Sequence, residues 1–168
     1  MRRYQDLINT RLVVEMQIMF TALRQQDFMV LDSTMMELNV INMLNTKHIV
    51  LNPNGAPFTN RHAMGYAWFV NKIQTVENAD EELAQVSSVD IRTMAVTDKK
   101  FSSSLENTEF GSAIRDRITL VDYQPNKLTY QCSTDGDRFA VFSEIYYEKG
   151  WNAYIDDQEA EHIRVDYL

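Results

Sequence analysis

Hydrophobic side chains near the start of the chain recur at spacings of three and four residues, which is the period of one helix face. Val13, Val14 and Ile18 lie off this stripe, so the helix also presents apolar side chains on a second side. We expect one long opening helix flanked by core and loop, with a partner or membrane contact as the less favoured alternative. The stripe consists of Tyr4, Leu7, Ile8, Leu12, Met16, Met19, Phe20 and Leu23.

The next apolar stretch, "TMMELNVINMLNTKHIVL", changes its pattern along its length. Thr34 and Glu37 have the spacing of a capping box, which predicts that a short helix begins at Thr34. The β-branched residues Ile49 and Val50 then predict a strand. The segment Asn52–Asn60 holds two of the three prolines and one of the five glycines, and it predicts a loop.

Aromatic and β-branched residues dominate Tyr66–Val76, which predicts a strand. Asn78 follows as the N-cap of a short helix with an acidic first turn, and "TMAVT" returns to extended structure. Three further segments, "RITLVDY", "KLTYQCS" and "RFAVFSEIYY", are joined through Pro125-Asn126 and Asp135-Gly136 and predict a β-meander. "WNAYI" predicts a fourth strand, with Trp151 largely buried and Tyr154 facing outward.

These patterns predict an α+β fold, with N-terminal helices followed by a mainly antiparallel β-sandwich. Residues 1–51 are a helical segment that leads into a strand, and residues 52–65 are a loop. Residues 66–168 are a β-rich, sandwich-like domain with one short helix at about 78–87. We expect these parts to form one structural unit.

Composition narrows the function classes. The chain is 45% hydrophobic with only 5 Gly and 3 Pro, which indicates a folded protein with a core. The net charge of -8 disfavours nucleic acid as a partner, because phosphate backbones are repelled by acidic surfaces. No stretch reaches the roughly 20 apolar residues that cross a bilayer, and polar residues interrupt the opening segment before it could act as a signal peptide.

Few residues offer chemistry. The three histidines stand alone, so we expect no metal site, and no glycine-rich loop predicts a cofactor site. Cys132 is the only cysteine and is expected to be a small core residue. Four carboxylates could supply the acid and base of a glycosidase, but acidic residues beside an exposed hairpin more often serve solvation. These carboxylates are Glu144, Glu148, Asp156 and Asp157.

Three stretches in the same order resemble one family. They are "RRYQDLIN", then "INMLNTKHIVLNPNG" with "GYAWFVNKIQTVENADEEL", and finally "VFSEIYYEKGWNAYIDD" followed by "IRVDYL". Together they resemble the C-terminal soluble region of YfhO-like bacterial membrane proteins. No single stretch is a catalytic motif, but the ordered series covers most of the chain and is specific.

Members of that family are polytopic and are regarded as membrane glycosyltransferases that use lipid-phosphate-linked sugars to decorate cell-envelope polymers. Their transmembrane helices and the acidic loop residues expected to catalyse transfer precede the matched region. The resemblance therefore implies a non-catalytic accessory domain on the extracytoplasmic face of a bacterial membrane. Its implied partners are the transmembrane part of the parent enzyme and envelope glycan.

The chain departs from the family in two places. Asp157 follows Asp156 where the family's hairpin has Asp-Gly, and a left-handed turn position costs more for Asp than for Gly. The chain also stops at Leu168, before the closing strands of family members, which leaves the completeness of the sandwich open. A strand in "HIRVDYL" or its neighbour would then have an open edge, which predicts either a homodimer or a monomer with a frayed C-terminus.

Two other functions remain open at this stage. A free-standing carbohydrate-binding module would need aromatic side chains on an exposed sheet face, and a small hydrolase would need two convergent carboxylates in a cleft. The candidate glycan contacts are Tyr147, Tyr154 and Glu144, and no catalytic residue is assigned. We expect neither glycosyl-transfer nor hydrolase activity from this chain alone.

Overall fold

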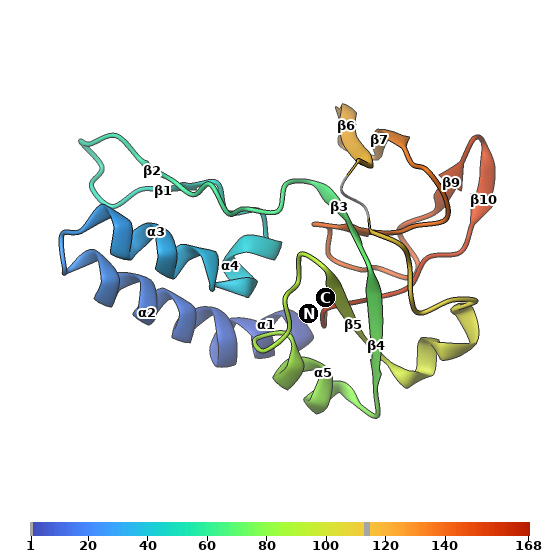
Figure 1. Cartoon of the computed structure of the whole chain (residues 1–168), viewed down its shortest axis with the longest axis horizontal. Helices are drawn as coiled ribbons and strands as arrows, with labels where there is room; N and C mark the ends of the chain where they lie inside the picture. Colours follow the sequence, from blue (N-terminus) through green and yellow to red (C-terminus); the bar gives the residue numbers. More distant parts are fainter. Residues whose placement is uncertain (1, 113–114) are drawn as a thin grey trace.

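The structure, a computed structural model, describes residues 2–112 and 115–168. An arm of helices and one small hairpin extends to one side, and most of the short strands gather on the other (Figure 1). The helical elements are α1 (Arg2–Leu7), η1 (Ile8–Leu12), α2 (Val13–Leu23), α3 (Phe28–Met36), α4 (Asn39–Met43), α5 (Ala79–Gln85) and η2 (Lys99–Ser104). In the described ranges, no helix combines the length and the apolar character needed to cross a membrane.

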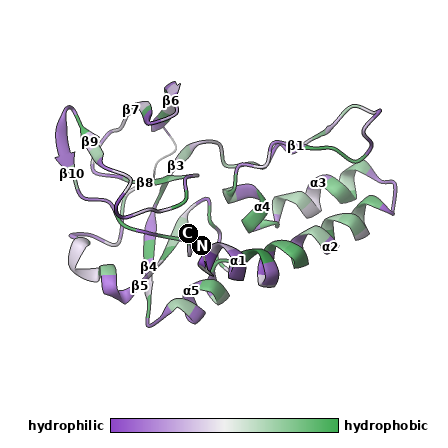
Figure 2. Cartoon of the chain, turned by 180° about the vertical axis from the view of Figure 1, so that it is seen from behind, coloured by the Kyte–Doolittle hydropathy of each residue, from purple (hydrophilic) through white to green (hydrophobic). Residues whose placement is uncertain are grey.

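The predicted opening helix is confirmed, because α1, η1 and α2 follow one another without a break. Leu7 and Met19 are buried, whereas Tyr4, Met16 and Phe20 of the same stripe are exposed, so only part of the predicted stripe faces the core. The off-stripe residues Val13 and Ile18 remain exposed, and much of α2 has the colour of hydrophobic residues in Figure 2. The second apolar side of this helix thus faces solvent in the structure.

The helix predicted to begin at Thr34 begins earlier. Asp27 is the N-cap of α3, and its carboxylate accepts hydrogen bonds from the backbone N–H groups of Met29 and Val30. Thr34 lies inside α3, where its hydroxyl donates to the carbonyl of Val30 at 2.7 Å. The capping-box prediction was wrong, because a threonine hydroxyl satisfied by the preceding turn does not mark a helix start.

A distant carboxylate starts the next helix. The N-cap of α4 is Leu38, whose side chain cannot accept a hydrogen bond. Glu15 of α2 supplies the missing acceptor, since its two carboxylate oxygens accept from the N–H groups of Val40 and Ile41 at 2.9 and 2.8 Å. Burial raises the pKa of Glu15, while these two hydrogen bonds lower it. The arm is therefore held together by a buried polar contact as well as by packing.

The strands confirm the α+β class, and they pair as five two-stranded sheets. Four pairs are antiparallel, and β4 with β5 is parallel. In the described part of the chain, several two-stranded sheets therefore stand where the sequence predicted the larger sheets of a sandwich. The strands are β1 (His48–Ile49), β2 (Phe58–Thr59), β3 (Ala67–Val70), β4 (Lys72–Val76), β5 (Met94–Asp98), β6 (Arg117–Gln124), β7 (Lys127–Ser133), β8 (Phe139–Phe142), β9 (Ala153–Ile155) and β10 (Gln158–Ala160).

The strand–helix–strand series around α5 agrees with the sequence prediction, except that the single strand predicted for Tyr66–Val76 is divided into β3 and β4, which belong to different sheets. Asn78 caps α5, and its side-chain oxygen accepts from the N–H groups of Asp80 and Glu81. The helix leads from β4 into β5, which pair in parallel from Lys72↔Met94 to Val76↔Asp98. A parallel pair requires such a crossover, because its strands run in the same direction.

The predicted meander is corrected at its third segment. β6 and β7 form the expected hairpin through Pro125-Asn126, but β8 pairs with β3. The reason is burial: Trp68 of β3 lies opposite Val141 of β8, and both side chains are in the core. Cys132 on β7 is exposed, so its prediction as a core residue was also wrong.

The C-terminal residues 161–168 pack into the core and do not form the predicted edge strand. Residues 161–168 form no strand, and Arg164, Asp166 and Tyr167 are buried. The N–H of Asp166 donates to the carbonyl of Val96 at 2.7 Å, and the Thr97 hydroxyl donates to the carbonyl of Arg164 at 2.8 Å. The open edge predicted for "HIRVDYL" is therefore absent, and a homodimer through the neighbouring β9–β10 hairpin stays a prediction.

The two-residue turn between β9 and β10 offers a direct test of local strain. Asp156 and Asp157 both have positive φ, at 50° and 65°, as a type I′ turn requires. Replacing Asp157 with glycine should raise the free energy of unfolding by about 0.5–1 kcal/mol, since glycine adopts this conformation without a side-chain penalty. Chemical denaturation checks this. Glu159→Gly in β10 should have the opposite sign, and a destabilised Asp157→Gly chain would show that the turn is not strained.

Candidate functional site

Glu144 lies just after β8, in a segment that is fixed by its neighbour Ser143. The Ser143 N–H donates to the carbonyl of Tyr66 at 3.0 Å. Its hydroxyl lies 2.8 Å from the carbonyl oxygen of Met43 and 2.7 Å from that of Gly65. The backbone that carries Glu144 is thereby tied to the end of α4 and to the start of β3.

The side chain of Glu144 is half-buried and has no ion-pair or hydrogen-bond partner within the described residues. Burial raises the pKa of its carboxyl group above the usual range. A half-buried carboxylate without a protein donor keeps part of its hydration, so it is open to a ligand that can donate a hydrogen bond.

Aromatic side chains lie beside this carboxylate. The ring of Tyr130, on β7, meets the ring of Phe142 edge to face at 4.9 Å between centroids. The pKa of Tyr130 is raised to about 12. Burial is the largest cause, and the charge of Glu144, then Tyr66 and Tyr123, raise it further. The phenol oxygen of Tyr130 is buried and has no hydrogen-bond partner. Tyr123 and Tyr130 share the β6–β7 hairpin, and the N–H of Ser143 donates to the carbonyl of Tyr66, so the backbone that carries Glu144 lies beside that of Tyr66.

We call Tyr66, Tyr123, Tyr130, Phe142 and Glu144 the Glu144 patch. Tyr123 is 65% exposed, while Tyr66 and Phe142 are each 43% exposed, so the patch presents large ring surfaces to solvent. A cation already rests on its border, because Lys47 Nζ lies 4.9 Å from the centroid of the Tyr66 ring. The patch thus combines exposed ring surface with one half-buried carboxylate that has no partner in the described residues, while the phenol oxygen of Tyr130 is buried.

The other two predicted glycan contacts lie outside this patch. Tyr154 is on β9 opposite Glu159 and is 62% exposed, which confirms its outward orientation. The Tyr147 ring covers Gly150 so closely that a Cβ built on Gly150 would stand 2.1 Å from the ring. No hydrogen bond or ring contact joins Tyr147 or Tyr154 to Glu144 in the described part of the chain.

Trp151 is only half-buried, which corrects the prediction that it is a large core residue. Strand β9 begins at Ala153, so the expected alternation does not extend back to Trp151. Ile155, which strand alternation would place on the same face as Trp151, is 68% exposed. The indole N–H of Trp151 donates to the carbonyl of Ile145 at 3.3 Å, which closes a turn beside Tyr147.

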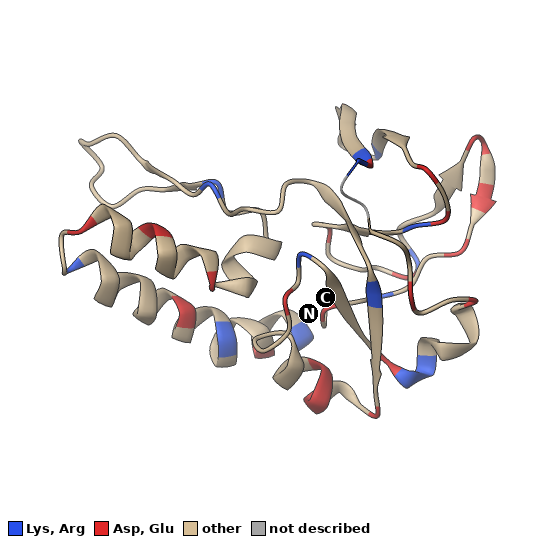
Figure 3. Cartoon of the chain, viewed as in Figure 1, with Lys and Arg blue, Asp and Glu red and all other residues tan. Residues whose placement is uncertain are grey.

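A second polar cluster joins the two ends of the described chain. Glu82 is fully buried and accepts hydrogen bonds from Arg3 at 3.0 Å, from Arg164 at 2.8 Å and from the N–H of Tyr167 at 3.1 Å. The guanidinium of Arg3 also lies 4.7 Å from the Tyr167 ring centroid. The Glu82 carboxylate is satisfied within the fold, which is typical of a structural network, although the buried Nε of Arg164 has no hydrogen-bond partner. Charged residues elsewhere are spread over the whole chain (Figure 3).

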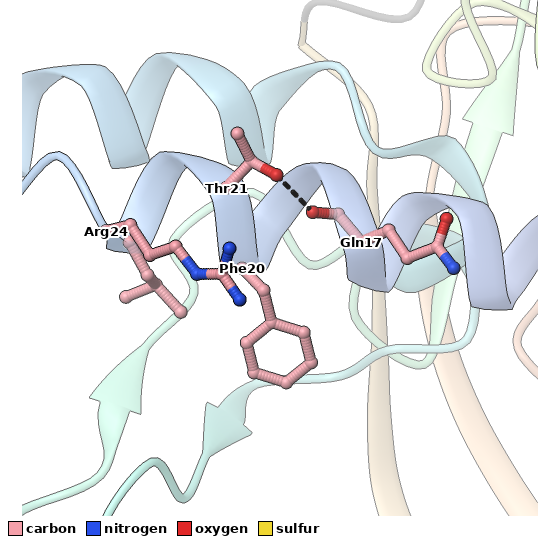
Figure 4. A pocket seen from close by; sticks show the side chains of 5 residues that line it. Gln17, Phe20, Thr21 and Arg24 are labelled. Carbon is pink, nitrogen blue, oxygen red and sulfur yellow. Dashed lines mark hydrogen bonds between the residues drawn. The ribbon is translucent and has the colours of Figure 1, made fainter.

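A depression with about 470 Å³ of space lies on the outside of α2 (Figure 4). Gln17, Phe20, Thr21, Leu23 and Arg24 line it, and all belong to this helix or its C-cap. The Thr21 hydroxyl donates to the carbonyl of Gln17 at 2.9 Å, so its polar group is already satisfied. This depression is a gap between side chains along one helix and brings no reactive groups together.

Residues 2–112 and 115–168 contain no group of three or more His, Cys, Asp or Glu side chains arranged to hold a metal ion. The four carboxylates weighed from the sequence are dispersed: Glu144 lies in the patch, Glu148 is exposed, and Asp156 and Asp157 form the β9–β10 turn. Comparisons of this chain with known protein families, curated proteins and solved structures found no match.

Proposed function

We propose that this chain is a non-catalytic extracytoplasmic accessory domain of a YfhO-like membrane glycosyltransferase, and that the Glu144 patch contacts envelope glycan. The ordered resemblance from "RRYQDLIN" to "IRVDYL" supports the family assignment. The geometry of the patch supports the glycan contact. The partners of the chain are then the transmembrane part of the parent enzyme and the glycan that this enzyme decorates.

One observation carries the glycan contact: a half-buried carboxylate without a partner in the described residues belongs to the same patch as exposed aromatic rings. The ionised carboxylate of Glu144 can only accept hydrogen bonds. A sugar hydroxyl can donate to it. The apolar C–H face of the same sugar ring can pack on Tyr66 or Tyr123, as binding sites with few polar groups among apolar ones require.

Glu144 serves binding in this proposal and not proton transfer. Its raised pKa has burial as its cause, whereas a glycosidase needs a second carboxylate at about 5–9.5 Å on the other side of the bond. The chain is therefore expected to bind glycan without turnover of aryl glycosides or lipid-linked sugar donors. Turnover that is lost in Glu144→Gln would overturn the accessory-domain proposal.

Two tyrosines with matched exposure test the location of the site. An array of bacterial envelope polysaccharides, followed by calorimetric titration of the polysaccharide that binds, should give an affinity that falls at least about tenfold in Tyr123→Ala. Tyr154→Ala removes an equally exposed ring from β9 and should leave the affinity unchanged. An affinity that falls in Tyr154→Ala and not in Tyr123→Ala would place the site on the β9–β10 hairpin. If no polysaccharide on the array bound the chain, glycan binding would be refuted.

A free-standing carbohydrate-binding module is the alternative, since the same patch would serve it. The coding DNA on either side of this sequence separates the two functions. An adjoining reading frame with membrane-spanning segments supports the accessory domain, while stop codons at both sides favour the free-standing module.

A further inference from the structure

We infer that the chain forms a two-fold symmetric dimer in which α2 packs antiparallel against α2 of a second copy. This inference goes beyond the proposed function and does not depend on glycan binding. Three features of α2 carry it: an exposed apolar surface of the size that interfaces use, the lack of exposed charge, and a residue pattern that is complementary to itself.

The size of the apolar surface matches that of an interface. The outside of α2 holds five large apolar side chains that are each 39–48% exposed, namely Val13, Val14, Met16, Ile18 and Phe20. With about 150–200 Å² for a fully exposed side chain, they leave roughly 400 Å² of apolar surface, and patches of this size on soluble proteins commonly mark interaction sites. The exposed Gln17 and Thr21 bring the face to roughly 600 Å² per copy, so two copies reach the low end of a standard interface, about 1,200 Å² in total.

The same surface carries no charge. The only charged residue of α2 is Glu15, which is buried and accepts hydrogen bonds from the N–H groups of Val40 and Ile41. Because the chain has a net charge of -8, two copies repel each other over most of their surfaces. Contact through α2 brings no like charges together, whereas a charged partner would find no group on this helix to pair with. Arg24, at the C-cap, and its copy would lie at opposite ends of the antiparallel pair.

The apolar residues form two rows that suit an antiparallel copy. Met16 and Phe20 are four residues apart, as are Val14 and Ile18, so each pair forms a ridge on the helix surface. Gln17 lies between the two ridges. A two-fold axis at Gln17 reverses the helix direction and sets each ridge against the same ridge of the second copy. Phe20 of one copy then meets Met16 of the other.

Two depressions adjoin Gln17, which lines both of them. One has about 470 Å³ of space, with Phe20 and Leu23 in its wall (Figure 4). The other has about 340 Å³, with Val14 and Ile18 in its wall, and it extends to α3. Helices pack by placing the ridges of one into such grooves of the other. The side-chain amide of Gln17 has both donors and an acceptor, so it can form a hydrogen bond with its own copy on the axis.

Substitutions of Gln17 test the axis. In Gln17→Glu two carboxylates meet only in the dimer, and in Gln17→Lys two ammonium groups do. Sedimentation velocity should show the wild type passing from monomer to dimer with a dissociation constant of about 1–100 μM, as expected for a small interface. Each variant alone should associate at least about tenfold more weakly. An equimolar mixture of the two variants should form the dimer again, because opposite charges then meet across the axis.

Gln158→Glu is the matched control, because it makes the same change at an exposed position of β10. It should leave the dimer intact, and unchanged circular dichroism of each variant confirms that it is folded. A wild type that stays monomeric overturns the inference, and binding of that monomer to phosphatidylcholine vesicles would assign the α2 face to a bilayer. A dimer that only Gln158→Glu weakens lies on the β9–β10 hairpin, and Gln17 variants that stay monomeric when mixed exclude the axis at Gln17. Both results contradict the inference, as does a dimer that neither Gln17 variant weakens.

Discussion

Replacing Glu82 with alanine should lower the free energy of unfolding by roughly 3–5 kcal/mol, the cost of breaking a buried ion pair by removing one partner. Glu82 is fully buried, and it accepts hydrogen bonds from two arginines and one backbone N–H. The buried guanidinium of Arg164 would lose its carboxylate partner, and the N–H of Tyr167 would lose its acceptor. Urea denaturation at neutral pH measures the loss.

The control is a surface ion pair of the same chemistry. Glu77 pairs with Lys99, but both side chains are largely exposed, so Glu77→Ala should cost less than about 1 kcal/mol. Glu82→Gln should lie between the two, since it keeps an acceptor and loses the charge. If Glu82→Ala and Glu77→Ala had similar effects, the network between the two chain ends would not stabilise the fold.

Replacing Asp166 with asparagine should stabilise the protein at alkaline pH. The Asp166 side chain is buried, and one oxygen accepts from the N–H of Val96 at 2.8 Å while the other has no partner. Burial raises the pKa of Asp166 from 3.8 to about 7, the hydrogen bond from Val96 lowers it, and the charge of Glu82 raises it further. The folded chain thus keeps a proton that the unfolded chain releases.

The sign of the pH dependence follows from that proton. Below about pH 4 the group is protonated in both states and costs the fold nothing. As pH rises toward about 7 the unfolded state gains stability by ionising, so the wild type is progressively destabilised, by about 4 kcal/mol once the folded group is also ionised. Asparagine does not titrate, and it tolerates the positive φ of 52° at this position.

Denaturation curves measured from about pH 4 to about pH 8 test this. The stability of Asp166→Asn relative to the wild type should increase across that range. Asp137→Asn, at an exposed position, should give a constant difference. A constant difference for Asp166→Asn as well would show that Asp166 is already ionised in the folded chain at acidic pH.

Local signals predicted the elements that depend on nearby residues. The Asn78 cap and the Pro125-Asn126 turn are set by side chains within a few positions, so sequence reading found α5 and the β6–β7 hairpin. The start of α4 was not readable in this way, because its cap comes from Glu15, more than twenty residues earlier. Helix starts that rest on tertiary contacts leave no local signature.

Pairings between distant strands were missed for the same reason. β3 with β8 and the burial of residues 164–167 both depend on which side chains share the core, and sequence spacing does not record this. The parallel β4–β5 pair did have a signal, since a strand, a capped helix and a second strand within one short stretch indicate a crossover.

The candidate site was recovered only in part. Glu144 was selected from the sequence, but Tyr130 and Tyr66 were not, because they belong to separate strands and turns. In the β6–β7 hairpin Tyr123 lies opposite Leu128, and Tyr130 follows two residues later on β7, so both tyrosines lie on one face of the hairpin. Strand alternation could have predicted this shared face from the sequence. Tyr147 and Tyr154 remain predictions, outside the patch that the fold assembles.

Nuclear magnetic resonance spectra of the whole chain, recorded while an envelope polysaccharide is added, test the glycan contact most directly. The largest changes should fall on the ring signals of Tyr66, Tyr123, Tyr130 and Phe142 and on the amide of Glu144, with β9 and β10 unaffected. Changes confined to the β9–β10 hairpin, or spectra that do not change at all, would contradict the assignment of this patch as the glycan-binding surface.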